Sequence, residues 1–160
     1  MPSARIKRQN KAPQDDAKAI DQSVLLRMLG YNCLQAYLVL VPSIKKLLAK
    51  YSLKPAEFSV LALVKSNPDV NQKRLGQAIN ISPPNLATLL DRMESNGLLT
   101  RQRNPSDKRS QVLVLTPKGS NLCDKAQAAT AKLDSVPGLS DAEHATLMLL
   151  LQKVFLPLRR

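Results

Sequence analysis

Apolar residues recur every three or four positions in the middle of the chain, which is the spacing of one buried helix face. The clearest run follows Ser82, a good N-cap, and Pro83, which suits the first helical position. Its buried face is predicted to consist of Leu86, Leu89, Leu90 and Met93. A shorter helix is predicted over residues 72–79, and Asn80-Ile81 between the two helices is short enough for a tight turn.

Two extended runs follow the second helix, which Asn96-Gly97 is expected to end. Residues 98–103 and 110–115 are rich in β-formers, and the basic, turn-forming residues 104–109 separate them. Two helices joined by a tight turn and followed by a hairpin with cations at its tip are typical of a winged helix-turn-helix. We predict this unit over residues 55–115. We therefore predict a mainly α fold with a small β-hairpin wing (α+β). The alternative is a passive scaffold whose hairpin edge is protected by charge.

The chain before this region divides into a polar arm and a strongly apolar helical stretch. Residues 1–19 have too little apolar content to pack, so they form either a phosphate-contacting tail or a passive end. Residues 20–50 are apolar on more than one side, which indicates burial against more than one surface. We expect Pro42 to interrupt this helix with a kink. Another helix is predicted to begin at Pro55 and to end at Asn67-Pro68-Asp69.

Two more helices are predicted after the hairpin. Thr116-Pro117 begins the first, as N-cap and first helical residue. Ser140 and Glu143 have the spacing of a capping box in front of an apolar C-terminal run. Apolar first and last helices have no sheet to cover, and the economical solution is a second copy of the chain. We therefore expect residues 20–51 and 116–160 to form the dimerisation region of a symmetric homodimer.

Composition adds a polyanionic partner to this picture. The 160 residues include 24 Lys plus Arg against 12 Asp plus Glu, a formal net charge of +12. Nucleic acid is the first candidate, and aromatic residues at 3% with no Trp argue against a base-stacking single-strand platform. No apolar run is long enough to cross a bilayer and no export signal core is present, so we expect no membrane partner and a cytoplasmic location. Cys33 and Cys123 are expected to be free thiols.

Side chains suited to double-stranded DNA lie on both the second helix and the wing. Asn85 and Thr88 share one face of that helix, and Asn is suited to adenine while Thr can meet a thymine methyl. Basic wing residues would meet phosphates and the minor groove, with Asp107 holding Arg109 or a neighbouring arginine. The predicted DNA-contacting set is Gln72, Lys73, Ser82, Pro84, Asn85, Thr88, Arg92, Arg101, Arg103, Asp107, Lys108 and Arg109.

With these residues in place, residues 21–160 resemble the MarR family of bacterial transcriptional regulators. The resemblance lies in Leu90-Asp-Arg-Met-Glu94, Asn96-Gly-Leu98, Arg101, Asn104-Pro-Ser-Asp-Lys-Arg109 and Leu115-Thr-Pro-Lys-Gly119. It implies an obligate dimer with entwined termini, recognition helices in successive major grooves and wing arginines in the minor groove. The chain departs from many relatives by having Thr88 where they carry Arg or Lys, so their base-reading pattern is not carried over.

The resemblance also implies release of DNA by a small molecule, often an aromatic acid or a related compound, or in some relatives by peroxide acting on cysteine. Arg27, Tyr31 and Tyr37 are the candidate effector-binding residues, since a buried cation and phenol hydroxyls could hold a carboxylate and a ring. The basic surplus would also suit a CoA thioester, and ordinary interface packing is the alternative. For the redox route, Cys33 lies in an apolar helix, where a buried thiol would be inert.

An enzyme is disfavoured by what the sequence lacks. His144 is the only histidine, no phosphate-cradling glycine motif occurs, and no metal site or cofactor is expected. The predicted function is a ligand-responsive repressor that binds a pseudo-palindromic operator as a homodimer and is released by a small, anionic aromatic effector or its CoA thioester. An architectural DNA-binding protein without a ligand, or a cysteine-based redox-sensing repressor, is the alternative.

Overall fold

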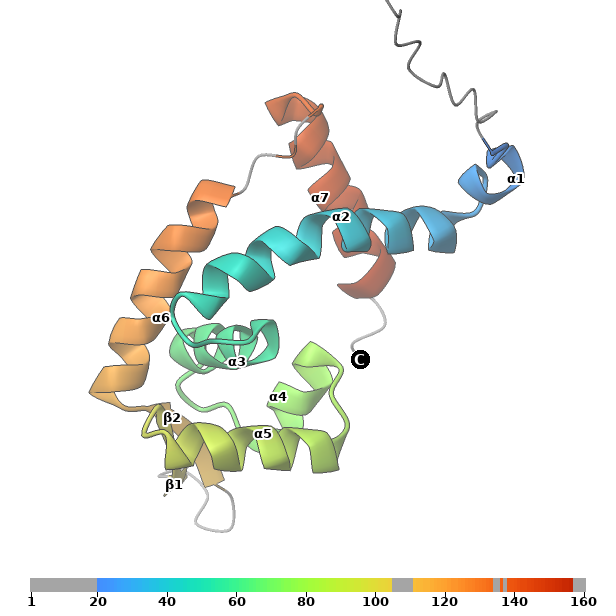
Figure 1. Ribbon diagram of the computed structural model, residues 1–160. Helices are drawn as coiled ribbons and strands as arrows, with labels where there is room; N and C mark the ends of the chain where they lie inside the picture. Colours follow the sequence, from blue (N-terminus) through green and yellow to red (C-terminus); the bar gives the residue numbers. More distant parts are fainter. Residues whose placement is uncertain (1–19, 105–110, 134–135, 137, 157–160) are drawn as a thin grey trace, which may run out of the picture. The chain divides into compact units, whose positions relative to one another are not determined.

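The computed structural model describes residues 20–104, 111–133, 136 and 138–156, which are drawn in colour in Figure 1. The chain divides into two compact units, residues 1–36 and residues 37–160. Helices and one antiparallel hairpin make up the described part, which confirms the predicted mainly α fold with a small wing. The elements are α1 (Ser23–Leu26), α2 (Leu29–Ala49), α3 (Pro55–Ser66), α4 (Gln72–Ile79), α5 (Pro83–Ser95), β1 (Leu99–Arg103), β2 (Gln111–Leu115), α6 (Pro117–Thr130), the 3-10 turn η1 (Ala131–Leu133) and α7 (Asp141–Phe155).

The first apolar stretch contains a helix break that was not predicted from the sequence. Helix α2 continues through Pro42, so this proline does not end the helix, and the expected kink beside it stays a prediction. A proline removes one hydrogen bond, and a helix of 21 residues tolerates that loss. The helical run is instead divided before Leu29, where α1 ends. There the side-chain amide of Asn32 donates to the carbonyl oxygens of Leu26 and Met28 at 2.8 and 2.9 Å, and so gives the Leu26 carbonyl at the end of α1 a partner.

In the second unit, α3 to α6 and the hairpin enclose one apolar core. Helix α3 contacts α4, α6 and β2, while α5 contacts α4 and β1. The fully buried side chains of this core include Leu48, Leu61, Leu75, Leu86, Leu90, Met93, Leu99 and Leu113. The hairpin pairs Leu99 with Leu115 and Arg103 with Gln111. A hydrogen bond of 3.0 Å from the Leu113 amide to the Val70 carbonyl oxygen attaches β2 to the segment before α4.

The start of α6 packs directly on the chain segment that leads into the wing. Thr116 is the predicted N-cap, and its hydroxyl accepts from the Gly119 amide at 3.0 Å and donates to the Gly97 carbonyl at 2.7 Å. A Cβ atom built on Gly119 would lie 1.9 Å from the carbonyl oxygen of Leu98. Glycine is therefore required at this position by the close approach of two backbones.

Gly119→Ala is expected to lower the free energy of unfolding by about 1–3 kcal/mol, because backbone rather than a flexible side chain must move to admit the methyl group. Urea unfolding followed by circular dichroism measures the change. Asn121→Ala is the matched control, since residue 121 is exposed on the same helix. An equal, small effect of both substitutions would contradict the proposed close contact.

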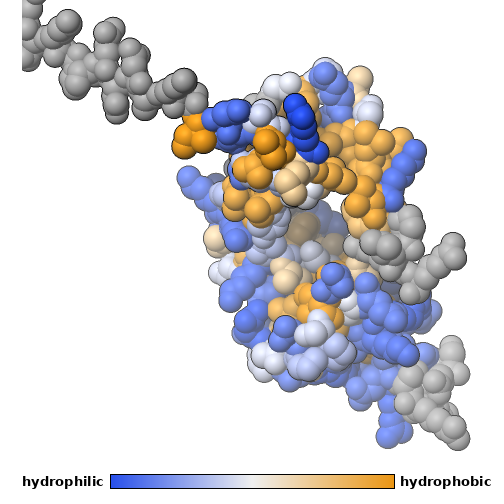
Figure 2. Space-filling model, turned by 90° about the vertical axis from the view of Figure 1, so that its right-hand side faces the viewer, coloured by the Kyte–Doolittle hydropathy of each residue, from blue (hydrophilic) through white to orange (hydrophobic). Residues whose placement is uncertain are grey.

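Large apolar side chains remain open to solvent in the two flanking regions, and Figure 2 shows apolar residues on the surface. Within the described part of the chain, none of these exposed large hydrophobic residues falls between residues 45 and 132. They are Ile20, Val24, Leu25, Leu26, Met28, Leu29, Leu34, Tyr37, Leu38, Val39, Leu40, Ile44, Leu133, Leu139, Leu147, Met148, Leu149, Leu150, Leu151, Val154, Phe155 and Leu156. No helix in the described ranges combines the length and apolarity needed to cross a membrane.

Candidate nucleic-acid interface

Helices α4 and α5 form a tight two-helix unit whose turn is fixed by local chemistry. The Asn71 side chain caps α4 by accepting from the Arg74 amide at 2.9 Å. Asn80 ends the helix in the left-handed conformation, with φ 53° and ψ 45°, which asparagine tolerates better than most residues. The two helices approach closely at Gly76, where a Cβ atom would lie 3.1 Å from the Leu86 side chain and 3.3 Å from the Ile81 carbonyl oxygen.

Helix α5 has the buried and exposed faces that the sequence predicts. Leu86, Leu89, Leu90 and Met93 are buried, while Asn85 and Thr88 are exposed. Ser82 occupies the N-cap position without a side-chain cap hydrogen bond, and the two prolines after it have no amide hydrogen that needs a partner. The Thr88 hydroxyl donates to the Pro84 carbonyl oxygen at 3.2 Å. This bond leaves the Thr88 methyl group and the exposed Asn85 amide for a partner outside the chain.

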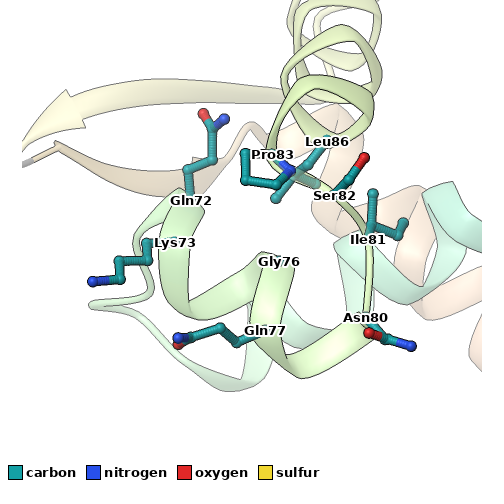
Figure 3. Close-up of a pocket in the computed structure, with 9 residues that line it drawn as sticks. All are labelled: Gln72, Lys73, Gly76, Gln77, Asn80, Ile81, Ser82, Pro83 and Leu86. Atoms are coloured by element: carbon teal, nitrogen blue, oxygen red, sulfur yellow. The ribbon is translucent and has the colours of Figure 1, made fainter.

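A pocket of about 880 Å³ lies between α4 and the start of α5. Figure 3 shows Leu86 pointing toward Gly76 from α5, with Lys73 and Gln77 extending from α4. Gln72 and Ser82, both predicted to contact DNA, also line it. Lysine, glutamine and serine side chains beside an apolar floor are suited to an anion or a nucleic-acid backbone, and no acidic residue lines this pocket.

Arg92 forms an ion pair within the chain with a carboxylate that the sequence did not single out, and its side chain is 45% exposed. Its Nε donates to Oε1 of Glu57 at 3.0 Å, and its Nη2 lies 2.8 Å from the same oxygen. Glu57 is only 6% exposed and also accepts from the Lys54 amide at 2.7 Å. The pair therefore ties the start of α3 to the C-terminal half of α5. No local sequence signal pairs Arg92 with Glu57, because the two residues lie 35 positions apart in the chain.

Arg101, also predicted to contact DNA, is surrounded by two acids of α5. Its Nη2 lies 2.6 Å from Oδ1 of Asp91, and its Nη1 donates to Oε2 of Glu94. The Arg101 amide donates to the other Glu94 oxygen at 3.0 Å. Burial alone lowers the pKa of Arg101, but the hydrogen bonds and negative charges of Asp91 and Glu94 outweigh it and raise that pKa above its usual value. The Arg101 side chain is 21% exposed, whereas that of Asp91 is 66% exposed.

Within the described residues of these elements, exposed cations outside the two ion-pair groups are Lys73, Arg74 and Arg103. Arg103 ends β1 at the base of the wing. Asp107, Lys108 and Arg109, the predicted wing-tip residues, lie outside the described residues. Arg74 was missed by the sequence analysis, although its place in the first turn of α4 beside Lys73 is a usable signal.

The candidate effector residues are divided between the two units, with Arg27 and Tyr31 in the first and Tyr37 in the second. Arg27 is exposed at the end of α1 in the single chain, and its role as a cation in an effector site stays a prediction. The Tyr31 hydroxyl donates to the Gln22 side chain at 2.8 Å, and Tyr37 is 55% exposed and belongs to the other unit.

Both cysteines are free thiols, as the sequence predicts. Cys33 is exposed in the single chain, on the apolar helix where a buried thiol was considered. Cys123 is buried, and burial raises the pKa of its thiol although Lys65 nearby opposes the rise.

Comparison with known proteins gives a consistent result. The family model described as MarR family matches residues 53–111. An uncharacterised HTH-type transcriptional regulator, YkoM, of Bacillus subtilis is 32% identical over 106 residues, which cover 65% of this chain and 69% of YkoM. A transcriptional regulatory protein assigned to the hcr operon of Thauera aromatica is 28% identical over 103 residues. That match covers 63% of this chain and 62% of the Thauera protein, less than two thirds of its length.

Solved structures extend the likeness over more of the chain. The transcriptional repressor CouR bound to a 23-mer DNA duplex superposes with a TM-score of 0.76 at 31% identity, covering 85% of this chain and 98% of that one. CouR from Rhodococcus jostii RHA1 bound to p-coumaroyl-CoA superposes with a TM-score of 0.73 at 25% identity, covering 81% and 93%. The winged helix-turn-helix predicted from the sequence is therefore confirmed as the fold.

Proposed function

This chain belongs to the MarR family of transcriptional regulators, and we propose that it represses transcription by binding a pseudo-palindromic operator as a homodimer until an anionic aromatic effector releases it. The family is one of DNA-binding regulators rather than of enzymes. The observation that carries the proposal is α5, which has a buried apolar face and an exposed face with Asn85 and Thr88. A helix of this kind, preceded by a tight turn, fits the major groove.

The proposed DNA surface combines this helix with cations on both sides of it in the sequence. Lys73 and Arg74 at the start of α4 and Arg103 on the wing would meet phosphates, with Lys108 and Arg109 adding charge at the wing tip. Phosphate contacts supply much of the affinity, and base contacts supply the sequence preference. The net charge of +12 favours this assignment, since it raises the encounter rate with a polyanion.

The proposed dimer rests on the apolar side chains of the flanking helices. Monomeric proteins rarely expose so many large apolar residues together, and a second copy would bury them. Two recognition helices related by two-fold symmetry would then face two half-sites about one turn of DNA apart. The proposed dimerisation region consists of residues 20–51 and 116–160.

The proposed effector is an aromatic acid or its CoA thioester. CouR from Rhodococcus jostii RHA1 is similar over most of this chain and binds p-coumaroyl-CoA, which supports a ligand of this class here. A thioester of CoA also carries several phosphate charges, which the basic surplus suits. Arg27, Tyr31 and Tyr37 stay candidates for contacting it.

The test begins with a duplex selected by the protein from a random library, compared with a scrambled duplex of the same length and composition. A specific regulator should prefer the selected duplex by a factor of about 10³ or more. p-Coumaroyl-CoA and p-coumaric acid are then added, and melting temperature and duplex affinity are measured. A true effector should raise the melting temperature and weaken binding to the selected duplex, because it binds the free protein more tightly than the DNA complex.

Coenzyme A alone is the matched control, since it shares the phosphates but lacks the aromatic acyl group. Release by CoA alone would assign the effect to charge. A preference below tenfold for the selected duplex, with no response to aromatic acids or thioesters, would replace this proposal by the architectural DNA-binding protein.

A further inference from the structure

We propose that Arg101 is not a DNA ligand but a positioning residue, which fixes the wing to the recognition helix through Asp91 and Glu94. The inference rests on the DNA-binding function proposed above and deepens it. It gives Asp91 and Glu94 of α5 a role within the chain, whereas acids on a DNA-binding helix would by themselves repel DNA.

The contacts lock both the side chain and the backbone of Arg101. The two ends of its guanidinium reach different carboxylates, Asp91 through Nη2 and Glu94 through Nη1. Glu94 also accepts from the Arg101 amide, so one carboxylate spans the side chain and the main chain of β1. With two acids around it and a side chain only 21% exposed, this guanidinium has little surface left for a phosphate.

The same turn of α5 is anchored on a second side. Arg92 pairs with the buried Glu57 of α3, so residues 91, 92 and 94 connect the helix both to the wing and to the core. The exposed face with Asn85 and Thr88 lies toward the opposite end of α5. A wing attached to the C-terminal half of α5 would hold the cations of the wing at a constant distance from Asn85 and Thr88.

Electrostatics makes the two possible roles of this cluster give opposite results. A carboxylate on a DNA-binding helix repels phosphates, so neutralising Asp91 and Glu94 should strengthen DNA binding if they only contribute charge. If they hold Arg101 and therefore the wing, neutralising them should weaken binding even though the net charge becomes more positive. The sign of the change therefore distinguishes the roles.

The first variant is the double substitution Asp91→Asn with Glu94→Gln in the full-length chain. We expect its affinity for both selected and scrambled duplexes to fall about fivefold or more, the size expected when two ion pairs are lost. The slope of log affinity against log salt should become shallower by about one unit, as for a lost phosphate contact. Unchanged or tighter binding would overturn the proposal.

The second variant, Arg101→Lys, keeps the charge but cannot reach two carboxylates with one planar group. A phosphate ligand would tolerate this change, whereas a positioning residue would not, so we expect the same loss of affinity and salt slope as for the double variant. Wild-type affinity and slope in Arg101→Lys would overturn the proposal. Since lysine preserves charge and bulk, this variant also tests the role if the double variant does not fold.

A double-mutant cycle with Arg103→Ala adds a measurement that would not change if the Arg101→Lys chain were only less stable. Arg103 lies two residues further along β1, so it should contribute less to DNA affinity once the wing is released. We expect Arg103→Ala to cost clearly less in the Arg101→Lys background than in wild type. Equal costs in both backgrounds would show independent action and contradict the inference.

Asp69→Asn is the matched control, because Asp69 is an exposed acid in the segment before α4 that belongs neither to the Arg101 ion pairs nor to the proposed dimerisation region. It should leave affinity and salt slope unchanged. Binding to the scrambled duplex distinguishes a failure of the proposed regulator function from a failure of the positioning role proposed for Arg101. If wild type shows no preference for the selected duplex, the proposed regulator function fails, yet the effects of Asp91, Glu94 and Arg101 can still be measured on scrambled DNA.

Discussion

Leu150→Glu is expected to convert the dimer into folded monomers at concentrations where the wild-type chain is dimeric. Leu150 is 53% exposed in the single chain, so the substitution leaves the core of the second unit intact. Helix α7 shows a stripe of exposed apolar residues at helical spacing, namely Leu147, Leu150, Leu151 and Val154. Such a stripe needs a covering surface, and we propose that the partner copy provides it.

The size of this effect follows from symmetry. Burying one leucine is worth about 1.5–3 kcal/mol. A two-fold interface contains each substitution twice, so the dimer would lose about 3–6 kcal/mol, on the order of 10²- to 10⁴-fold in its dissociation constant. DNA affinity should fall with it, because a monomer contacts only one half-site.

Sedimentation equilibrium over a range of micromolar concentrations measures the change, and circular dichroism checks that the monomer is folded. Ser66→Glu is the control, since it adds the same charge at an exposed position of α3 outside the proposed dimerisation region. A Leu150→Glu chain that remains dimeric with wild-type affinity would rule out this helix as part of the interface. A monomeric wild-type chain would rule out the dimer itself.

Asn85→Ala is expected to remove most of the preference for the selected duplex while leaving binding to scrambled DNA almost unchanged. Asn85 is exposed in the first turn of α5, where its amide can make two hydrogen bonds to an adenine edge. One such contact is worth about 1–3 kcal/mol of discrimination. With two half-sites the expected loss is about 2–6 kcal/mol, or roughly 30-fold and above.

Arg103→Ala is the matched comparison, since it removes a wing cation rather than a base contact. It should weaken both duplexes alike and reduce the salt slope by about one unit per half-site, and Arg109→Ala carries the same expectation. Fluorescence anisotropy titrations at two salt concentrations measure both quantities. If Arg103→Ala affected only the selected duplex and Asn85→Ala affected both equally, the assigned roles of the two elements would be reversed.

The sequence by itself determined the features that depend on neighbouring residues. Helix faces follow from three- and four-residue spacing, which is why Leu86, Leu89, Leu90 and Met93 are buried as predicted. Caps and turns also depend on local chemistry, and the capping box of Ser140 and Glu143 forms as its spacing indicates. Local hydrogen bonding therefore sufficed for the element order and, with the family motifs, for the fold.

Only the tertiary structure decided which charged side chains are engaged within the chain. Nothing local to Arg92 or Arg101 indicates their partners, because Glu57 lies 35 residues from the first and Asp91 and Glu94 lie on a different element from the second. The break before α2 was likewise not predicted from the sequence, and there the Asn32 side-chain amide donates to the carbonyl oxygens of Leu26 and Met28. Periodicity marks which face of a helix is apolar, whereas ion pairs and backbone contacts between elements depend on how the folded chain brings distant residues together.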